Sequence, residues 1–188
     1  MAGRLVVDRS SIGPRLPAME HRWSIALRKE DFRFSCAHFL IFPDGSKERL
    51  HGHNYQVSCR VEGALDGHGL VIDFNQVKPL VRALCQAFDE RWLVPQDNPL
   101  LDIRPGDDGH TEVRFKDRRY LVPSDEIVVL PLNNISVENL ASHLAARLWQ
   151  ALRERFGSAQ VTTVEVAVAE TSGQEGCYRI SDPGSVGG

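Results

Sequence analysis

The stretch HNYQVSCRVE, residues 53–62, indicates the fold class because its side chains alternate in character along its whole length. One face carries His53, Tyr55, Val57, Cys59 and Val61, and the other carries Asn54, Gln56, Ser58, Arg60 and Glu62. Successive side chains of a strand point to opposite faces of its sheet. The stretch therefore predicts an antiparallel strand with one buried and one polar face.

Further strands are expected on both sides of this stretch. Residues 22–39 alternate as a long strand or a hairpin, with RKED as a bulge or a turn between its halves. Residues 161–170 predict a third strand, and CYRIS, residues 177–181, a short fourth one. TEVRFKDRRYLVP followed by DEIVVLP is interpreted as a hairpin at about 111–131, within an irregular insertion at about 91–135.

Two amphipathic helices complete the pattern. Asp73 can cap a helix that runs to about Phe88, although Pro79 favours a regular start only near Lys78. Ser136 opens a second helix with an apolar stripe on one side. One-faced strands and two such helices predict an α+β fold in which helices pack on a sheet.

The composition describes one ordinary globular domain. The chain has 188 residues, of which 42% are hydrophobic and 25% charged, with a net charge of −3. There is no basic stripe for nucleic acid, no apolar run that could span a membrane and no signal-peptide pattern. The four cysteines form no CxxC pair and are expected to be reduced in a cytoplasmic protein. We expect flexible tails at 1–20 and 184–188 and a single domain at 21–183.

Three histidines near strand ends are candidate metal ligands. His51 and His53 point to the same side of a strand, and His38 ends the neighbouring run. Three imidazoles suit zinc and leave a fourth position open, as in catalytic sites. The alternative is that HxH arises by chance and that each histidine is a satisfied polar residue.

Carboxylates near these strands allow two interpretations each. Glu170 follows three alternating valines, so it either reaches solvent at the strand end or is a buried carboxylate that holds a planar donor. Asp89 and Glu90 follow the first helix, either as a solvated helix end or as a general-base pair. Lys47 is either an exposed loop residue or a point charge for a phosphate.

Several motifs together resemble one enzyme family over about residues 22–182. They are FSCAHFL, LHGHNYQVSCRVEG, GLVIDF, SVENLA and VEVAVAET, in this order. The combination resembles the 6-pyruvoyl-tetrahydropterin synthase / 6-carboxytetrahydropterin synthase family. The resemblance implies a tunnelling fold, in which a four-stranded antiparallel sheet carries two helices on one face, here with an inserted β-hairpin.

The resemblance also implies an assembly and a site. Subunits would join sheet edge to sheet edge around an axis, as a hexamer formed from two trimers, with active sites between subunits. Zinc would be bound by His38, His51 and His53. Glu170 would anchor a small-molecule pterin substrate, and Ser136 would place a hydroxyl near it.

The catalytic positions depart from the family pattern. Lys47 stands where the usual cysteine is expected, and Asp89–Glu90 stands where an aspartate and a histidine are paired. Cys36 is the nearest cysteine in sequence that could substitute. A subset of the family carries a glutamate at the spacing of Glu48, and such enzymes cleave the side chain of 7,8-dihydroneopterin triphosphate to give a 6-hydroxymethyl pterin.

This resemblance therefore predicts a zinc-dependent pterin lyase or synthase. Glu48 would be the general base, and Asp89 with Glu90 the second acid/base group. The alternatives are a 6-carboxytetrahydropterin synthase of deazaguanine synthesis and a member of the fold that binds a pterin or purine without turnover.

Overall fold

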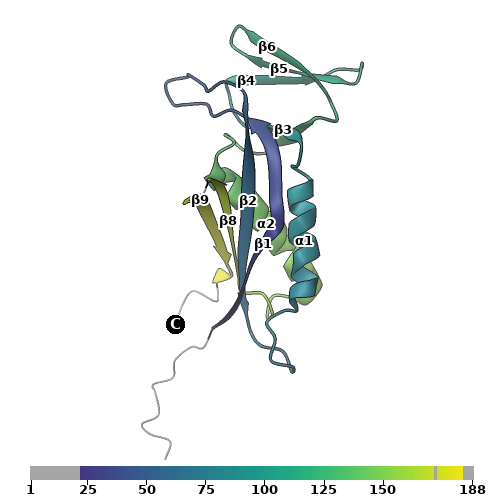
Figure 1. Ribbon diagram of the computed structural model, residues 1–188, viewed down its shortest axis with the longest axis vertical. Helices are drawn as coiled ribbons and strands as arrows, with labels where there is room; N and C mark the ends of the chain where they lie inside the picture. The colour runs from purple at the N-terminus through teal and green to yellow at the C-terminus, as the bar shows by residue number, and fades with distance from the viewer. Residues whose placement is uncertain (1–21, 172, 184–188) are drawn as a thin grey trace, which may run out of the picture.

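A computed structural model describes residues 22–171 and 173–183, and its main sheet has two helices on one face (Figure 1). Strand order in this sheet is β7-β3-β1-β2-β8-β9. The strands are β1 (Trp23–His38), β2 (His51–Gly63), β3 (Arg91–Pro95), β7 (Ile127–Leu130), β8 (Thr163–Thr171) and β9 (Gln174–Ser181). The helices are α1 (Phe74–Gln86) and α2 (Val137–Phe156). The tails expected at 1–20 and 184–188 lie outside the described residues.

The predicted four-stranded antiparallel sheet forms one side of this larger sheet, from β1 to the edge strand β9. β1 pairs with β2, β2 with β8, and β8 with β9, all antiparallel. β1 is one continuous strand with a register shift between Arg28 and Arg33, so the bulge interpretation of RKED is correct and the hairpin interpretation is wrong. The α+β class is confirmed.

The region 91–135 contains a hairpin at 110–123, as predicted, but also further strands. β3 and β7 add two strands in parallel to the edge of the main sheet. The remainder is a separate three-stranded sheet of β4 (Leu101–Pro105), β5 (His110–Phe115) and β6 (Arg118–Pro123), at the top of Figure 1. DEIVVLP was assigned to the hairpin, but its apolar residues pair with the buried strand β3. That long-range pairing has no local signal.

Helix α1 begins at Phe74, as the expected Asp73 cap predicts. The Asp73 side chain accepts a hydrogen bond from the backbone N–H of Asn75 at 2.8 Å, which caps the helix at Phe74. Pro79 lies inside the helix, where it removes one backbone N–H donor. The cap and the buried Val77 and Val81 offset that loss, so the expected start near Lys78 is wrong.

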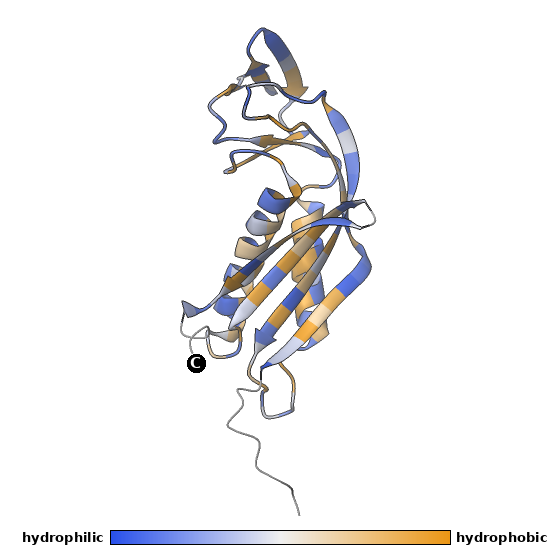
Figure 2. Ribbon diagram, turned by 90° about the vertical axis from the view of Figure 1, so that its left-hand side faces the viewer, coloured by the Kyte–Doolittle hydropathy of each residue, from blue (hydrophilic) through white to orange (hydrophobic). Residues whose placement is uncertain are grey.

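The core lies between the main sheet and the two helices. Alternation along the strands, visible as blue and orange bands in Figure 2, sends one set of side chains towards the helices. The fully buried set includes Phe32, Phe34, Tyr55, Val61, Val77, Leu140, Leu144, Leu148 and Leu152. A second cluster joins the segment after β1, the strands β3 and β7 and the inserted sheet through Phe39, Ile41, Trp92, Val94, Val113, Phe115 and Ile127. Among the described residues, no helix has the length and apolar character needed to cross a membrane.

Candidate active site and metal centre

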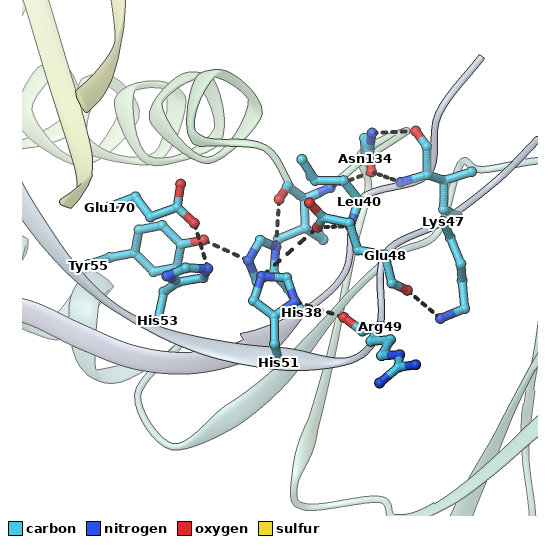
Figure 3. A network of polar contacts seen from close by, with 12 residues as sticks. His38, Leu40, Lys47, Glu48, Arg49, His51, His53, Tyr55, Asn134 and Glu170 are labelled. Atoms are coloured by element: carbon cyan, nitrogen blue, oxygen red, sulfur yellow. Dashed lines mark hydrogen bonds and ion pairs between the residues drawn. The ribbon is translucent and has the colours of Figure 1, made fainter. Parts of the chain in front are cut away.

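The pairing of β1 with β2 brings the three predicted histidines together. His38 lies opposite His51 in the antiparallel register, and Cys36 lies opposite His53. The ring centroids of the three histidines are 4.7 to 5.3 Å apart. One ligand atom from each histidine and one from Glu170 lie within 4.8 Å of one another (Figure 3). This donor set is a candidate metal centre.

Backbone carbonyls orient two of the imidazoles. Nδ1 of His38 lies 3.0 Å from the carbonyl oxygen of Ile135, and Nδ1 of His51 lies 2.7 Å from that of Arg49. In the tautomer that satisfies these carbonyls, each Nδ1–H donates and each Nε2 keeps a lone pair. A second hydrogen bond of this kind is typical of histidines that bind metals. Burial lowers the pKa of His38, which favours the neutral form that a metal requires.

Tyr55 is a member of the site that sequence reasoning did not single out for chemistry. Its hydroxyl lies 3.0 Å from Nε2 of His38, and its side chain is 1% exposed. Burial raises the pKa of Tyr55, so the hydroxyl stays protonated and donates to this nitrogen. The HNY motif placed Tyr55 on the same face as His53, which was the available signal.

Glu170 points into the histidine cluster. Its Oε1 lies 2.7 Å from Nε2 of His53, and its side chain is 28% exposed. The register of β8 against β9 shifts between Ala169 and Thr171, at the position of Glu170. The Glu170 carboxylate is thus half-buried at the cavity. This position agrees better with the interpretation of a buried carboxylate than with that of a side chain reaching solvent at the strand end.

Glu48 lies on the other side of the same cluster, in the loop between β1 and β2. Its Oε2 is 3.9 Å from Nε2 of His51 and accepts a hydrogen bond from the backbone N–H of Leu40 at 3.0 Å. A cavity of about 510 Å³ is lined by Glu48, the three histidines, Ser136 and Glu170, among others. A carboxylate therefore shares one cavity with the candidate metal ligands.

Ser136 reaches this cavity from the start of α2. It is the N-cap residue, and its Oγ accepts a hydrogen bond from the backbone N–H of Asn139 at 3.3 Å. The predicted helix start is confirmed, and Ser136 lies where a ligand in the cavity could contact it.

Asp89 and Glu90 lie apart from Glu48. One carboxylate oxygen of Asp89 accepts a hydrogen bond from the backbone N–H of Ser35 at 2.7 Å. Glu90 has a left-handed backbone with φ of 56° and lines a second cavity of about 750 Å³, which His53 and Glu170 also line. Glu48 lines the first cavity and Glu90 the second, and His53 and Glu170 lie between them.

The structure changes the interpretation of two other candidates, Cys36 and Lys47. Burial, followed by the charges of Asp89 and Glu170, raises the pKa of Cys36 to about 12, so its thiol is not an activated nucleophile. Lys47 is half-buried, with its ammonium 4.1 Å from the ring centroid of Phe39. The expectation of an exposed loop lysine is wrong.

The fold and the site together define a class of protein. Its members have an α+β fold with two helices on a sheet, and a set of His and Glu donors where two strands meet. The model of the family described as 6-pyruvoyl tetrahydropterin synthase matches residues 26–180. The chain belongs to this family and is an enzyme of the pterin-synthase type.

Curated relatives and solved structures support this assignment. The chain is 27% identical to a putative 6-carboxy-5,6,7,8-tetrahydropterin synthase of Methanocaldococcus jannaschii, covering 78% of this chain and 89% of the relative. It is 33% identical to a probable enzyme of the same name from Halobacterium salinarum, covering 77% and 80%.

The crystal structure of 6-pyruvoyl tetrahydropterin synthase from Plasmodium vivax has a TM-score of 0.80 and 29% identity, covering 87% of this chain and 100% of that one. A variant of the Plasmodium vivax protein is described as a catalytic residue mutant in which glutamate is replaced by alanine. Its structure has a TM-score of 0.80 and 28% identity, and the match covers 87% of this chain and 100% of that one.

Proposed function

We propose that this enzyme is a zinc-dependent pterin lyase that acts on the side chain of 7,8-dihydroneopterin triphosphate or a close relative. The observation that carries the proposal is the position of Glu48, whose carboxylate lies 3.9 Å from His51 in the cavity that holds the three histidines. The description of a glutamate as the catalytic residue of the similar Plasmodium vivax protein supports the same assignment.

The donor set fits zinc. His38, His51 and His53 offer three imidazole nitrogens from one strand junction, and carbonyl partners favour an Nε2 lone pair on His38 and on His51. A metal bound to Nε2 of His38 would replace the hydrogen bond that this nitrogen accepts from the Tyr55 hydroxyl. When bound, zinc would supply Lewis-acid chemistry that lowers the pKa of a substrate hydroxyl in the open position.

Glu170 and Ser136 are proposed to hold the pterin. Both line the cavity of the histidines, and Glu170 is half-buried there. A carboxylate can accept two N–H donors from the edge of a planar ring, which fixes the orientation of that ring. The Ser136 hydroxyl can donate to a ring oxygen or nitrogen while it still accepts from Asn139.

Glu48 is proposed to remove the proton from the second hydroxyl of the substrate side chain. The bond between the first two side-chain carbons then breaks, the second carbon becomes an aldehyde, and the electron pair of the broken bond moves into the C=N system of the dihydropterin ring. Protonation of the first carbon completes a 6-hydroxymethyl pterin. Asp89 and Glu90 are proposed as the second acid/base group, with Glu90 in the adjoining cavity.

A second candidate is 6-carboxytetrahydropterin synthesis. The names of the Methanocaldococcus jannaschii and Halobacterium salinarum relatives favour it. Mass spectrometry of the products separates a hydroxymethyl pterin from a carboxytetrahydropterin. Binding of zinc and a pterin without any product would indicate the non-catalytic alternative.

We also propose a homo-hexamer in the cytoplasm, with active sites between subunits. In the described part of the chain, β7 and β9 are the edge strands of the main sheet, and each has a side on which no strand pairs. Edges of this kind can pair with another subunit. Sedimentation measures the assembly state.

The test of the catalytic proposal is the Glu48→Gln variant, purified with its zinc content measured. The amide keeps the shape of the side chain but cannot take a proton at neutral pH. We expect the turnover number to fall by about 10²- to 10⁴-fold, the usual contribution of a general base. Undiminished turnover of dihydroneopterin triphosphate with zinc retained would exclude Glu48 as the base.

A further inference from the structure

The ammonium group of Lys47 lies among three aromatic rings. Its Nζ is 4.1 Å from the ring centroid of Phe39, 5.4 Å from that of Tyr120 and 5.7 Å from that of Phe115. Phe39 follows β1, whereas Phe115 ends β5 and Tyr120 lies in β6. We call these three rings the aromatic cage. Two of its three walls therefore come from the inserted sheet.

The caged lysine is bonded to the residue that carries the proposed base. Nζ of Lys47 donates a hydrogen bond to the backbone carbonyl of Glu48 at 2.7 Å. Lys47 also forms an isolated bridge with Ile41, so the chain reverses between them. The backbone N–H of Glu48 then donates to the carbonyl of Leu40 at 3.0 Å, and its carboxylate accepts from the N–H of Leu40 at 3.0 Å.

A second contact from the insertion holds the tip of the same loop. Nζ of Lys116 donates to the backbone carbonyl of Gly45, which has a positive φ of 74°. Glycine adopts this conformation without a steric cost. The loop between β1 and β2 is thus tied to the inserted sheet at two points, one beside Glu48 and one at its turn.

We propose that Lys47 is a positioning residue and that the inserted sheet serves the active site through it, by holding the Glu48 carboxylate at the histidine cluster. This inference rests on the proposed role of Glu48. A cation over aromatic faces is attracted by their quadrupoles, most strongly where water is excluded, and Phe39 and Phe115 are almost fully buried. The cage fixes the ammonium, the ammonium fixes the Glu48 carbonyl, and the carboxylate keeps its place on Leu40.

The contacts of Lys47 explain how a loop can supply a catalytic group. Loops are more mobile than the elements they connect, and an error of about 1 Å in placing a catalytic group can cost about a hundredfold in rate. The histidines lie on strands that pair with each other, but Glu48 lies outside both strands. Its geometry therefore depends on contacts that the paired strands do not provide.

The test compares Lys47→Met with Lys47→Arg in the full-length, zinc-loaded enzyme. Methionine keeps much of the volume but has no charge and no donor, whereas a guanidinium can stack on aromatic faces and donate to a carbonyl. We expect Lys47→Met to lower kcat about tenfold with KM and zinc content almost unchanged, because misplacing a base affects the chemical step. Lys47→Arg should recover most of that loss.

A matched pair at Tyr120 tests the cage without changing the loop. Tyr120→Phe keeps the aromatic face and should leave kcat unchanged. Tyr120→Leu removes that face and should lower kcat, as Lys47→Met does. This pair also keeps the proposal falsifiable if Lys47→Met does not fold. Equal activity of the two Tyr120 variants would overturn the role of the cage.

Hydrogen exchange at the Leu40 amide gives a readout that needs no turnover. Its N–H is bonded to the Glu48 carboxylate, so Lys47→Met should make it exchange about tenfold faster while amides of β2 keep their protection. Unchanged exchange at Leu40 would overturn the positioning role. If the wild-type enzyme does not convert dihydroneopterin triphosphate, the proposed function fails, and the exchange rate still decides whether Lys47 holds Glu48.

Discussion

Replacing Asn134 with alanine should weaken both the fold and the metal centre, because one amide side chain joins the two segments that frame the site. Its Oδ1 accepts from the backbone N–H of Ile41 at 3.1 Å and from that of Ile135 at 3.2 Å, and its Nδ2 donates to the carbonyl of Ile41 at 2.9 Å. Ile135 is the residue whose carbonyl contacts Nδ1 of His38. Figure 3 shows Asn134 beside the site.

The magnitude follows from these three hydrogen bonds. Each contributes about 1 kcal/mol net, and Asn134 is half-buried, so water can replace part of the loss in the variant. We expect the free energy of unfolding to fall by about 2 kcal/mol, which lowers a urea midpoint by about 1 M for a domain of this kind. Since the His38 ring loses part of its orientation, zinc affinity should fall by about tenfold.

The assay is urea denaturation together with a chelator competition for zinc. Asn133→Ala is the matched control, because Asn133 is exposed and its side chain accepts one hydrogen bond, from Asn139 at 2.8 Å. That control should change the free energy of unfolding by no more than about 0.5 kcal/mol. The reasoning is refuted if Asn134→Ala costs no more stability than Asn133→Ala, or if zinc affinity is the same in both.

Three further outcomes are expected. With a chelator present, the free energy of unfolding should decrease as the pH falls below 6.5. Burial lowers the pKa of His38 and His143, so the unfolded chain binds more protons than the folded one at such pH. Urea midpoints at about pH 7.5 and about pH 5.5 measure this effect, and equal midpoints would contradict it. Gly63→Ala should destabilise by about 3 kcal/mol or more, since its Cβ would lie 1.8 Å from a backbone oxygen, whereas Gly67→Ala, with open space around it, should unfold almost as the wild type does. Deleting the sheet β4-β5-β6 should change the assembly state in sedimentation if it adds to a subunit interface, and an unchanged sedimentation coefficient would count against that role.

Much of the central fold could be predicted because its signals are local. Alternation over 53–62 follows from the two-residue period of a strand, so β2 and its buried face were predictable. Asp73 and Ser136 precede their helices and offer side-chain acceptors to the first turn, so both helix starts were marked in the sequence. The expected helix start near Lys78 was wrong because packing against the sheet outweighed the local preference of Pro79.

The histidine pair belongs to the part that sequence determines. His51 and His53 are two residues apart on one strand, so they must share a face, and the family motifs add His38. Glu48 stood out by its spacing from the same pair. What these patterns could not supply was the distance between any of these side chains.

Tertiary structure alone decided how these groups are supported. Asn134 contacts Ile41 across 93 positions, and Lys47 meets Tyr120 in a sheet that sequence reasoning took for part of a hairpin. The parallel pairing of β3 with β7 was missed for the same reason. A residue's period and caps are properties of its neighbours in the chain, whereas hydrogen bonds and ring contacts between distant segments exist only after the chain has folded. The sequence of this enzyme therefore determined its class and its candidate ligands, and the fold decided which side chains hold them in place.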